Sequence, residues 1–252
     1  MKLVKTLIHV HTDYSYDSSI SLETLANFME REDFGCVAVT DHDTIDGALM
    51  LRSRTTARVI VGEEVSTRDG HVIGLFLEEE IRPGMSARDT AAAIRDQGGL
   101  VFLPHPFVRM FGCGLGELAW ELADLFDAVE VNNAQNLRAA PERRAHGFAE
   151  RTGLIKYAGS DAHLPSSIAP CYQLLRDFDG PADFIDALRT AELREGRHPL
   201  RYFAEIGRQI IRSMARLPRT IRPAPAPQPE YARASYARSV PGGLEEMRAT
   251  QR

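Results

Sequence analysis

Short apolar runs alternate with longer amphipathic stretches through most of the chain. The apolar runs have the length of β-strands. They cover residues 3–9, 36–40, 58–65, 72–77, 100–103, 128–131, 155–159 and 172–175. A strand followed by a helical stretch, repeated along the chain, is the pattern of βα units. We therefore expect an α/β fold.

Helical stretches fill the intervals between these runs. They begin near Ser21, Thr44, Ser86, Leu115, Pro141 and Pro181. Ser21 and Ser86 are suitable helix N-caps, because a serine oxygen accepts a hydrogen bond from an unpaired backbone N–H. Proline suits the first turn of a helix. Short strands in this number, with helices between them, predict a parallel barrel rather than a two-layer sheet.

Polar side chains recur where the predicted strands end. They lie at 9–11 after the first strand, 40–43 after the second, 62–64 at the third, 71 at the start of the fourth, 104–106 after the fifth, 130–133 after the sixth and 159–163 after the seventh. The carboxyl ends of the strands of a βα barrel face one common mouth. We therefore expect these side chains to converge on one site.

The stretch HVHTDYSYD at the end of the first run has the composition of a metal site. His9 and His11 are two positions apart and therefore point to the same face of a strand. Asp17 follows a short turn that can return its carboxylate to them. Of eight histidines in the chain, six lie at strand boundaries; the other two, His146 and His198, are expected to be solvated.

Charge is distributed unevenly along the 252 residues. Residues 1–199 carry 20 Lys and Arg against 31 Asp and Glu, whereas residues 200–252 carry 10 Arg against 4 Glu. An acidic body argues against a broad nucleic-acid footprint, so no stable nucleic-acid complex is expected. Three scattered cysteines and the absence of a secretory signal or membrane-length apolar run are typical of a cytoplasmic protein.

With these residues assembled, the sequence resembles the PHP family, the polymerase and histidinol phosphatase phosphoesterases. The motifs that carry the resemblance are His9-x-His11 with Asp17, residues 40–43 (TDHD), Gly62-x-Glu64, residues 71–74 (HVIG), residues 104–106 (PHP), Glu130-x-Asn132 and residues 159–163 (GSDAH). They occur in the family's order, and the general layout extends to about residue 199. The resemblance implies a distorted (β/α)7 barrel.

The resemblance also implies a site for three divalent ions, which we expect to be Zn, Mn or Fe. The implied ligands are His9, His11, Asp17, His42, Glu64, His71, His105, Asp161 and His163. A mixed set of imidazoles and carboxylates suits these ions. Glu63 is expected to point away, to a salt bridge or solvent, and Asp41 to orient a ligand imidazole. Residues 130, 132 and 133 either support the ligands, line the pocket or are structural.

The implied reaction is hydrolysis of a phosphomonoester or nucleotide phosphate by a hydroxide shared between ions. Asp161, His163 and His105 are the expected catalytic residues, and the sequence does not decide which protonates the leaving group. Arg68, Arg109 and Arg138 are the expected phosphate contacts, because arginine binds phosphate in a bidentate manner. Two other functions stay open: a 5′–3′ exonuclease acting on short oligonucleotides, and a regulatory module without catalysis.

The last fifth of the chain differs from the rest. Apolar residues at 203, 206, 210, 214 and 217 with interleaved arginines predict a basic amphipathic helix over 200–219. It either packs on the barrel or attaches to an anionic membrane surface or a partner. Residues 220–252 begin with a proline-rich linker and are expected to be disordered. The domains are thus a catalytic barrel over 1–199, the helix and the tail.

Overall fold

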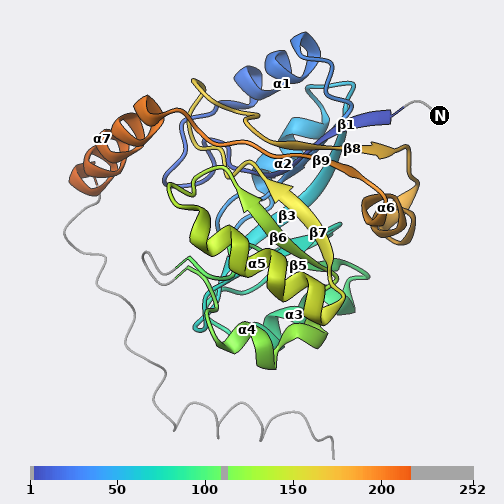
Figure 1. The fold of residues 1–252 in the computed structure, drawn as a ribbon. Helices are drawn as coiled ribbons and strands as arrows, with labels where there is room; N and C mark the ends of the chain where they lie inside the picture. The colour runs from blue at the N-terminus through green and yellow to red at the C-terminus, as the bar shows by residue number, and fades with distance from the viewer. Residues whose placement is uncertain (1–2, 109–112, 217–252) are drawn as a thin grey trace, which may run out of the picture. The chain divides into compact units, whose positions relative to one another are not determined.

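The computed structural model describes residues 3–108 and 113–216, with side chains described as far as residue 209. Within these residues the strands form one nine-stranded sheet (Figure 1). They are β1 (Leu3–Val10), β2 (Cys36–Val39), β3 (Arg58–Ser66), β4 (His71–Leu75), β5 (Leu100–Leu103), β6 (Ala128–Asn133), β7 (Ile155–Gly159), β8 (Tyr172–Arg176) and β9 (Glu192–Arg194). All eight predicted strands are present, and β9 was not predicted.

The sheet is mixed rather than parallel. Its order is β7-β6-β5-β4-β3-β2-β1-β8-β9; β1 to β3 and β5 to β7 are parallel, whereas β4 and β8 run antiparallel to their neighbours. The expectation of a wholly parallel barrel was therefore wrong at these strands. The physical reason at β4 is the turn over residues 67–70, which is too short for a crossover helix.

The reversal of β4 changes which end of that strand faces the site. His71 is the first residue of β4 and pairs with Ser66 near the end of β3. In a parallel strand its position would place it at the opposite end of the barrel from the other histidines. Because β4 is antiparallel, the start of the strand lies at the carboxyl end of β3.

The sheet nearly closes on itself through β1. The first half of β1 pairs with β8, from Leu3 opposite Arg176 to Thr6 opposite Gln173. The second half meets the segment after β7: Ser160 N donates to Ile8 O, and His11 N donates to Ala162 O. One edge of β1 thus pairs with β8 in its first half and with the segment after β7 in its second half. Because β7 is at the far end of the strand order, these contacts make the sheet barrel-like.

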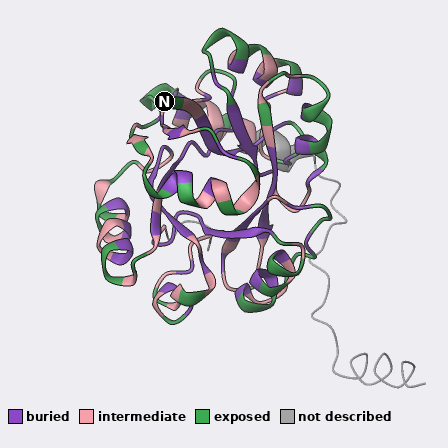
Figure 2. Ribbon diagram, turned by 90° about the vertical axis from the view of Figure 1, so that its right-hand side faces the viewer, coloured by how far each residue is buried: buried purple, intermediate pink, exposed green. Residues whose placement is uncertain are grey.

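Most of the helices lie outside the sheet, and one crosses the end of it that faces the viewer in Figure 2. They are α1 (Leu22–Arg31), α2 (Asp46–Arg52), α3 (Ala87–Asp96), α4 (Leu118–Glu121), the 3-10 turn η2 (Ala123–Leu125), α5 (Ala139–Thr152), α6 (Gly180–Arg189) and α7 (Leu200–Arg216). The predicted caps are confirmed, since Ser21 accepts from Thr24 N and Ser86 from Asp89 N. These caps fix where α1 and α3 begin after their loops.

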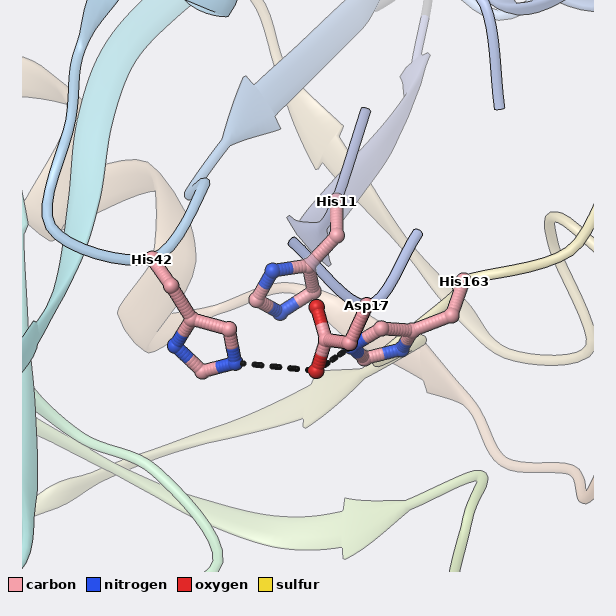
Figure 3. A group of neighbouring side chains, drawn as sticks. All are labelled: His11, Asp17, His42 and His163. Atoms are coloured by element: carbon pink, nitrogen blue, oxygen red, sulfur yellow. Dashed lines mark ion pairs between the residues drawn. The ribbon is translucent and has the colours of Figure 1, made fainter. Parts of the chain in front are cut away.

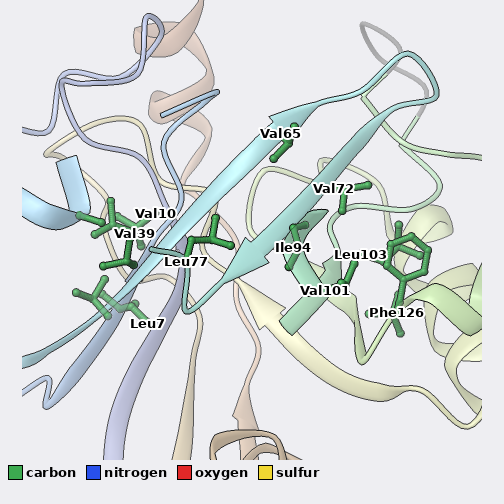
Figure 4. Packing of buried hydrophobic residues seen from close by; sticks show 14 of the residues in the cluster. Leu7, Val10, Val39, Val65, Val72, Leu77, Ile94, Val101, Leu103 and Phe126 are labelled. Carbon is green, nitrogen blue, oxygen red and sulfur yellow. The ribbon is translucent and has the colours of Figure 1, made fainter. Parts of the chain in front are cut away.

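Two apolar clusters pack on the two faces of the sheet, because alternate side chains of a strand point in opposite directions. The larger cluster joins the strands to the outer helices, and ten of its residues are labelled in Figure 4, including Leu7, Val101 and Ile94. The second cluster contains one or two residues from each of the strands β1 to β7, among them Ile8 and Phe102. The residues of this second cluster fill the interior of the barrel.

Helix α6 closes one end of this interior. Phe184 of α6 is fully buried, and its ring centroid lies 5.4 Å from that of Phe76, 6.3 Å from Phe102 and 4.8 Å from Phe178. The helix follows β8, which ends opposite the start of β1. Phe184 and the aromatic rings around it thus lie at the end of the barrel where β1 begins. The polar side chains of the predicted site lie at the other end.

The predicted C-terminal helix is present as α7, which ends at Arg216. Tyr202 of α7 is fully buried. The predicted end of this helix at 217–219 and the predicted linker and tail over 220–252 lie outside the described residues. Every helix in the described part of the chain is too short or too polar to span a bilayer.

Glu63 does not reach solvent or a salt bridge, contrary to expectation. Its side chain is 0% exposed, and Ile81 N donates to Oε2 over 2.8 Å. Burial raises the pKa of Glu63 to about 7, and the nearby carboxylates of Asp43 and Glu80 act in the same direction. The residue lies on the face of β3 that the loop around Ile81 covers, which explains its burial.

The substitution Glu63→Gln is therefore expected to stabilise the protein at alkaline pH. The folded pKa is about 7 and the unfolded value about 4.5, so the carboxyl's contribution to stability is present below pH 4.5 and lost as the pH rises to 7. The full loss is about 3 kcal/mol. Urea unfolding at pH 5 and pH 8 measures it: the variant's advantage over wild type grows between these values. An advantage independent of pH would contradict this explanation.

Candidate metal centre

Nine side chains that the sequence placed at strand ends come together in the structure. They form four overlapping groups whose nitrogen and oxygen atoms lie within 4.8 Å of one another inside each group. The groups are His11, Asp17, His42 and His163; His9, His11 and Asp161; His9, Glu64 and His105; and His42, Glu64 and His71. Every residue of the predicted ligand set thus belongs to at least one group.

Glu64 lies at the centre of the set and is 1% exposed. Its Oε1 atom lies 2.9 Å from His71 Nδ1 and 2.8 Å from His105 Nε2. Its Oε2 atom lies 3.3 Å from the Nε2 atoms of both His9 and His11, and 3.4 Å from His42 Nδ1. One buried carboxylate therefore contacts five histidines from four different strands or strand ends.

Asp17 is a second carboxylate of the site that contacts two histidines (Figure 3). Its Oδ2 atom lies 3.4 Å from His42 Nε2 and 3.3 Å from His163 Nε2. The ring of His11 stacks on that of His163, with centroids 4.2 Å apart. The loop after β1 therefore does return Asp17 to the histidines, as the sequence indicated.

Backbone strain is concentrated among these residues. His9 has φ 65°, Asp161 has φ 48° and His105 has φ 24°, all in a region that side chains with a Cβ rarely adopt. At His9 the register of β1 against β2 shifts between Leu7 and Val10. His9 and His11 thus reach one site through an irregular strand end rather than through simple alternation. Strain of this kind costs about 1–3 kcal/mol per residue and is typical of functional sites.

Opposite charges in the cluster outweigh the effect of burial. Burial alone would raise the carboxyl pKa values, but contacts with His71, His9 and His42 hold the pKa of Glu64 well below its usual range. Burial opposes ionisation of Asp161 too, yet His9 and the neighbouring imidazoles keep its pKa well below normal. In return, despite burial, the carboxylates raise the pKa of His9 and His163. The site thus brings ionised carboxylate oxygens into close contact with imidazole nitrogens.

The donor atoms fit divalent metal ions. His11 Nε2, His42 Nδ1 and Asp17 Oδ1 are buried and have no hydrogen-bond partner among the described residues. Two ligands about 2.1 Å from one ion at a tetrahedral angle are roughly 3.4 Å apart. Five contacts of His11, His42 and His163 with carboxylates are 3.3–3.5 Å long, which matches ligands that share an ion rather than hydrogen-bonded pairs.

Ser15 is a supporting residue that the sequence did not reveal, although it lies inside HVHTDYSYD. Its Oγ atom accepts a hydrogen bond from His42 N over 2.9 Å and donates to Asp41 Oδ1 over 3.1 Å. It lies 3.0 Å from His11 Nδ1. Because the hydroxyl proton goes to Asp41, His11 donates from Nδ1 and its Nε2 lone pair faces the cluster.

Asp41 was expected to orient a ligand imidazole, and in the described part of the chain its carboxylate reaches His11 through Ser15. Its carboxylate accepts hydrogen bonds from Thr12 N over 2.6 Å, from Thr12 Oγ1 over 2.7 Å and from Ser15. A Cβ atom at Gly47 would lie 2.1 Å from Asp41 Oδ2, so the start of α2 approaches this carboxylate too closely for a side chain. Asp41 therefore acts on His11 through Ser15.

The three polar residues of β6 have different roles, because the strand is irregular between Glu130 and Asn132. Glu130 is 2% exposed; His9 Nδ1 lies 2.9 Å from its Oε1 atom, and His105 N donates to its Oε2 atom over 2.7 Å. Asn133 donates to Glu130 and to Asp161 Oδ2. Asn132 instead donates to Glu142 on α5 and is structural.

Two of the three predicted phosphate-binding arginines, Arg68 and Arg138, lie in the described part of the chain. Arg68 is exposed in the turn between β3 and β4, and Arg138 is exposed at the N-cap of α5. Neither side chain forms an ion pair or hydrogen bond with the described residues. Arg109 lies outside the described residues. Substrate binding by the three stays a prediction.

His198 was expected to be solvated but is only 4% exposed. It stacks on Tyr202 with ring centroids 3.7 Å apart, and both residues lie beside the segment that carries Asp161 and His163. Gln135, also missed, donates to Asp161 O over 2.9 Å. No local pattern marks these residues as part of the site, because only the tertiary fold brings them there.

The chain is similar in sequence to two uncharacterized proteins of Methanocaldococcus jannaschii. It is 35% identical to MJ1587 over 144 residues, which are 52% of this chain and 82% of that protein. It is 27% identical to MJ0417 over 210 residues, 78% of this chain and 85% of that protein. Residues 141–193 match the model of a family described as PHP-associated.

Solved structures share the fold. A two-domain protein from Bacteroides vulgatus, which contains a predicted PHP-like metal-dependent phosphoesterase, superimposes with a TM-score of 0.64 at 15% identity. The match covers 77% of this chain and 65% of that protein, so the chain spans less than two thirds of it. The match to the PHP-associated family model and the shared fold support a PHP-family protein.

Two other solved structures also share the fold. PsfC from Pseudomonas syringae gives a TM-score of 0.60 at 18% identity and covers 85% of this chain and 98% of its own. The lesion-specific endonuclease EndoQ from Pyrococcus furiosus gives 0.53 at 16% identity and covers 76% of this chain and 57% of its own. At these identities the likeness concerns the fold alone.

Removal of the Ser15 hydroxyl is expected to weaken metal binding. In Ser15→Ala the imidazole of His11 loses the acceptor that fixes its orientation, and loss of such a partner typically lowers metal affinity 10- to 100-fold. Titration calorimetry with Mn²⁺ measures the change. Ser53→Ala, which removes only an exposed contact with Met50 O, is the control. Equal affinities of Ser15→Ala and wild type would disprove the role of Ser15.

Proposed function

We propose that this PHP-family protein hydrolyses a phosphoester in a reaction that depends on divalent metal ions. The observation that carries the proposal is the convergence of nine imidazole and carboxylate side chains on the buried carboxylate of Glu64. Burying this many ionisable groups is costly unless they are paired or bind metal. The substrate we propose is a phosphomonoester or a nucleotide phosphate.

The donor set indicates the ions. Six histidines with Asp17, Glu64 and Asp161 suit Zn, Mn or Fe, because imidazole binds these ions well and carboxylates tolerate all three. Cysteine is absent from the four groups among the described residues, which distinguishes the site from a structural zinc cluster. We propose that the nine residues hold three ions.

Divalent ions in this site would supply a hydroxide nucleophile near neutral pH and neutralise charge on the phosphoryl oxygens. The protein's own part is to hold nitrogen and oxygen donors in fixed positions at the mouth of the barrel. Asp161, which His9 and its neighbours keep ionised, is suited to bind an ion rather than to give a proton. His105 and His163 are then the proposed donors of the proton to the leaving group, each from the ring nitrogen that does not bind an ion.

A nucleotide or oligonucleotide end is the second candidate substrate, with hydrolysis from the 5′ end. Tyr16 favours it: this residue is 70% exposed, and its ring lies nearly parallel to that of His42 at 5.2 Å. An exposed ring beside the site offers a face on which a base can stack. The endonuclease activity of EndoQ is chemistry of the same kind at phosphorus. The third reading, a module without catalysis, is disfavoured because all nine residues are present.

The proposal predicts that protein loaded with Mn²⁺ hydrolyses an aryl phosphate. His105→Ala and Asp161→Ala are each expected to lower kcat/KM at least about 100-fold, since loss of a ligand costs no less than loss of the partner that orients it. The assay follows release of the phenolate by absorbance. His146→Ala is the control, because His146 lies on α5 and pairs with the exposed Glu195.

The same preparations decide between the substrates. Activity on the aryl phosphate and on nucleoside monophosphates, without shortening of a labelled oligonucleotide, supports the phosphatase. Stepwise shortening of the oligonucleotide supports the exonuclease. Rates that His105→Ala and Asp161→Ala leave unchanged would contradict a metal-dependent phosphoesterase of either type.

A further inference from the structure

The segment that joins β7 to β8 carries two of the nine residues and has a strained backbone. Asp161 has φ 48°, and its carbonyl oxygen lies 3.0 Å from His163 Nδ1. Non-glycine residues hold such conformations only where surrounding contacts determine them. The position of Asp161 and His163 therefore depends on what packs against this segment.

Helix α7 supplies much of that packing. The Tyr202 hydroxyl accepts a hydrogen bond from His163 N over 3.1 Å and lies 3.4 Å from Asp161 O. Ser166 Oγ donates to Glu205 over 2.8 Å. The backbone at both Asp161 and His163 is thus in contact with one phenol group.

His198 extends these contacts just before α7 begins. Its Nε2 atom lies 3.0 Å from Ser160 O, its Nδ1 atom lies 2.8 Å from Ser167 Oγ, and its N–H donates to Ala134 O. A neutral imidazole meets both side-chain contacts by donating from Nε2 and accepting at Nδ1. Tyr202 then stacks on this fixed ring, with an interplanar angle of 7°.

The same helix reaches a third residue of the cluster. Gln209 Nε2 donates to Asp17 O over 2.6 Å, two turns after Tyr202. Asp17 comes from the loop after β1, whereas Asp161 and His163 come from the loop after β7. Residues 198–209 thus connect two loops that are far apart in the sequence.

We propose that His198, Tyr202 and Gln209, here termed the α7 clamp, are positioning residues that hold Asp17, Asp161 and His163 in the geometry that binds metal. The proposal rests on the proposed metal-dependent function. It makes the start of α7 part of the site rather than a separate appendage. A chain that ended at Pro199 would lose Tyr202 and Gln209 together.

Two variants test the α7 clamp. Tyr202→Phe removes the hydroxyl and keeps the ring that stacks on His198; Gln209→Met removes the amide donor and keeps the length of the side chain. Matched controls are Tyr172→Phe, whose ring packs edge-on against Phe34, and Arg208→Ala, whose side chain donates to Ala204 O of its own helix and to no other described residue. All are made in the full chain.

The measurements are Mn²⁺ affinity and stoichiometry by titration calorimetry, the visible spectrum of the Co²⁺-loaded protein, and thermal unfolding of the metal-free protein. Each clamp variant is expected to bind Mn²⁺ at least about tenfold more weakly and to change the Co²⁺ spectrum, as loss of an orienting partner does. Metal-free Gln209→Met is expected to unfold at the wild-type temperature, and both controls to bind like wild type.

Each outcome is decisive. Wild-type affinity and spectrum in both clamp variants would overturn the α7 clamp while leaving the proposed function intact. The α7 clamp would also be overturned if Tyr202→Phe alone bound Mn²⁺ more weakly and had lost its fold. The weaker binding would then follow from unfolding, since the folded Gln209→Met variant would bind like wild type. Failure of wild type itself to take up Mn²⁺ or Co²⁺ would contradict the proposed function.

Discussion

The buried carboxylate of Glu64 is the interaction on which the rest of the structure depends. An isolated anion in a protein interior is costly, and here five imidazoles lie within 3.4 Å of its two oxygens. The histidines lie in β1 and β4 or directly after β1, β2 and β5, and these strand ends surround β3 because the sheet curves into a barrel. Fold and site therefore stabilise each other: the barrel assembles the donors, and the cluster holds together strand ends that carry strained residues such as His9.

Much of this arrangement was predictable from the sequence, for a definite reason. Strand ends meet at one mouth in a βα barrel, so histidines and carboxylates at those positions had to approach one another, as His11, Glu64 and His163 do. Short apolar runs likewise indicated every strand from β1 to β8. The direction of β4 was not predicted, although the short turn before His71 contained that information.

The supporting contacts could not be predicted, because they join residues without a shared local pattern. Ser15 touches His11, His42 and Asp41 through one oxygen, and nothing in its neighbourhood distinguishes it from Ser18. His198 has no apolar run around it in the sequence that would predict burial, yet its ring stacks on that of Tyr202. Glu63 similarly looks like a solvated neighbour of Glu64 until the loop at Ile81 covers it. The periodicity of a sequence predicts which face of a helix or strand a side chain occupies. The contacts of these three residues depend instead on which loops cover those faces, and periodicity does not predict that.

The central claim is that the nine residues bind divalent ions around Glu64. Crystals grown with Mn²⁺ and measured at wavelengths above and below the manganese absorption edge test it most directly, since the difference in anomalous signal locates manganese without reference to activity. Peaks about 2.0–2.3 Å from donor atoms of the four groups are predicted, with ligand distances typical of such ions. Well-ordered crystals whose maps contain no manganese peak among these side chains would contradict the account.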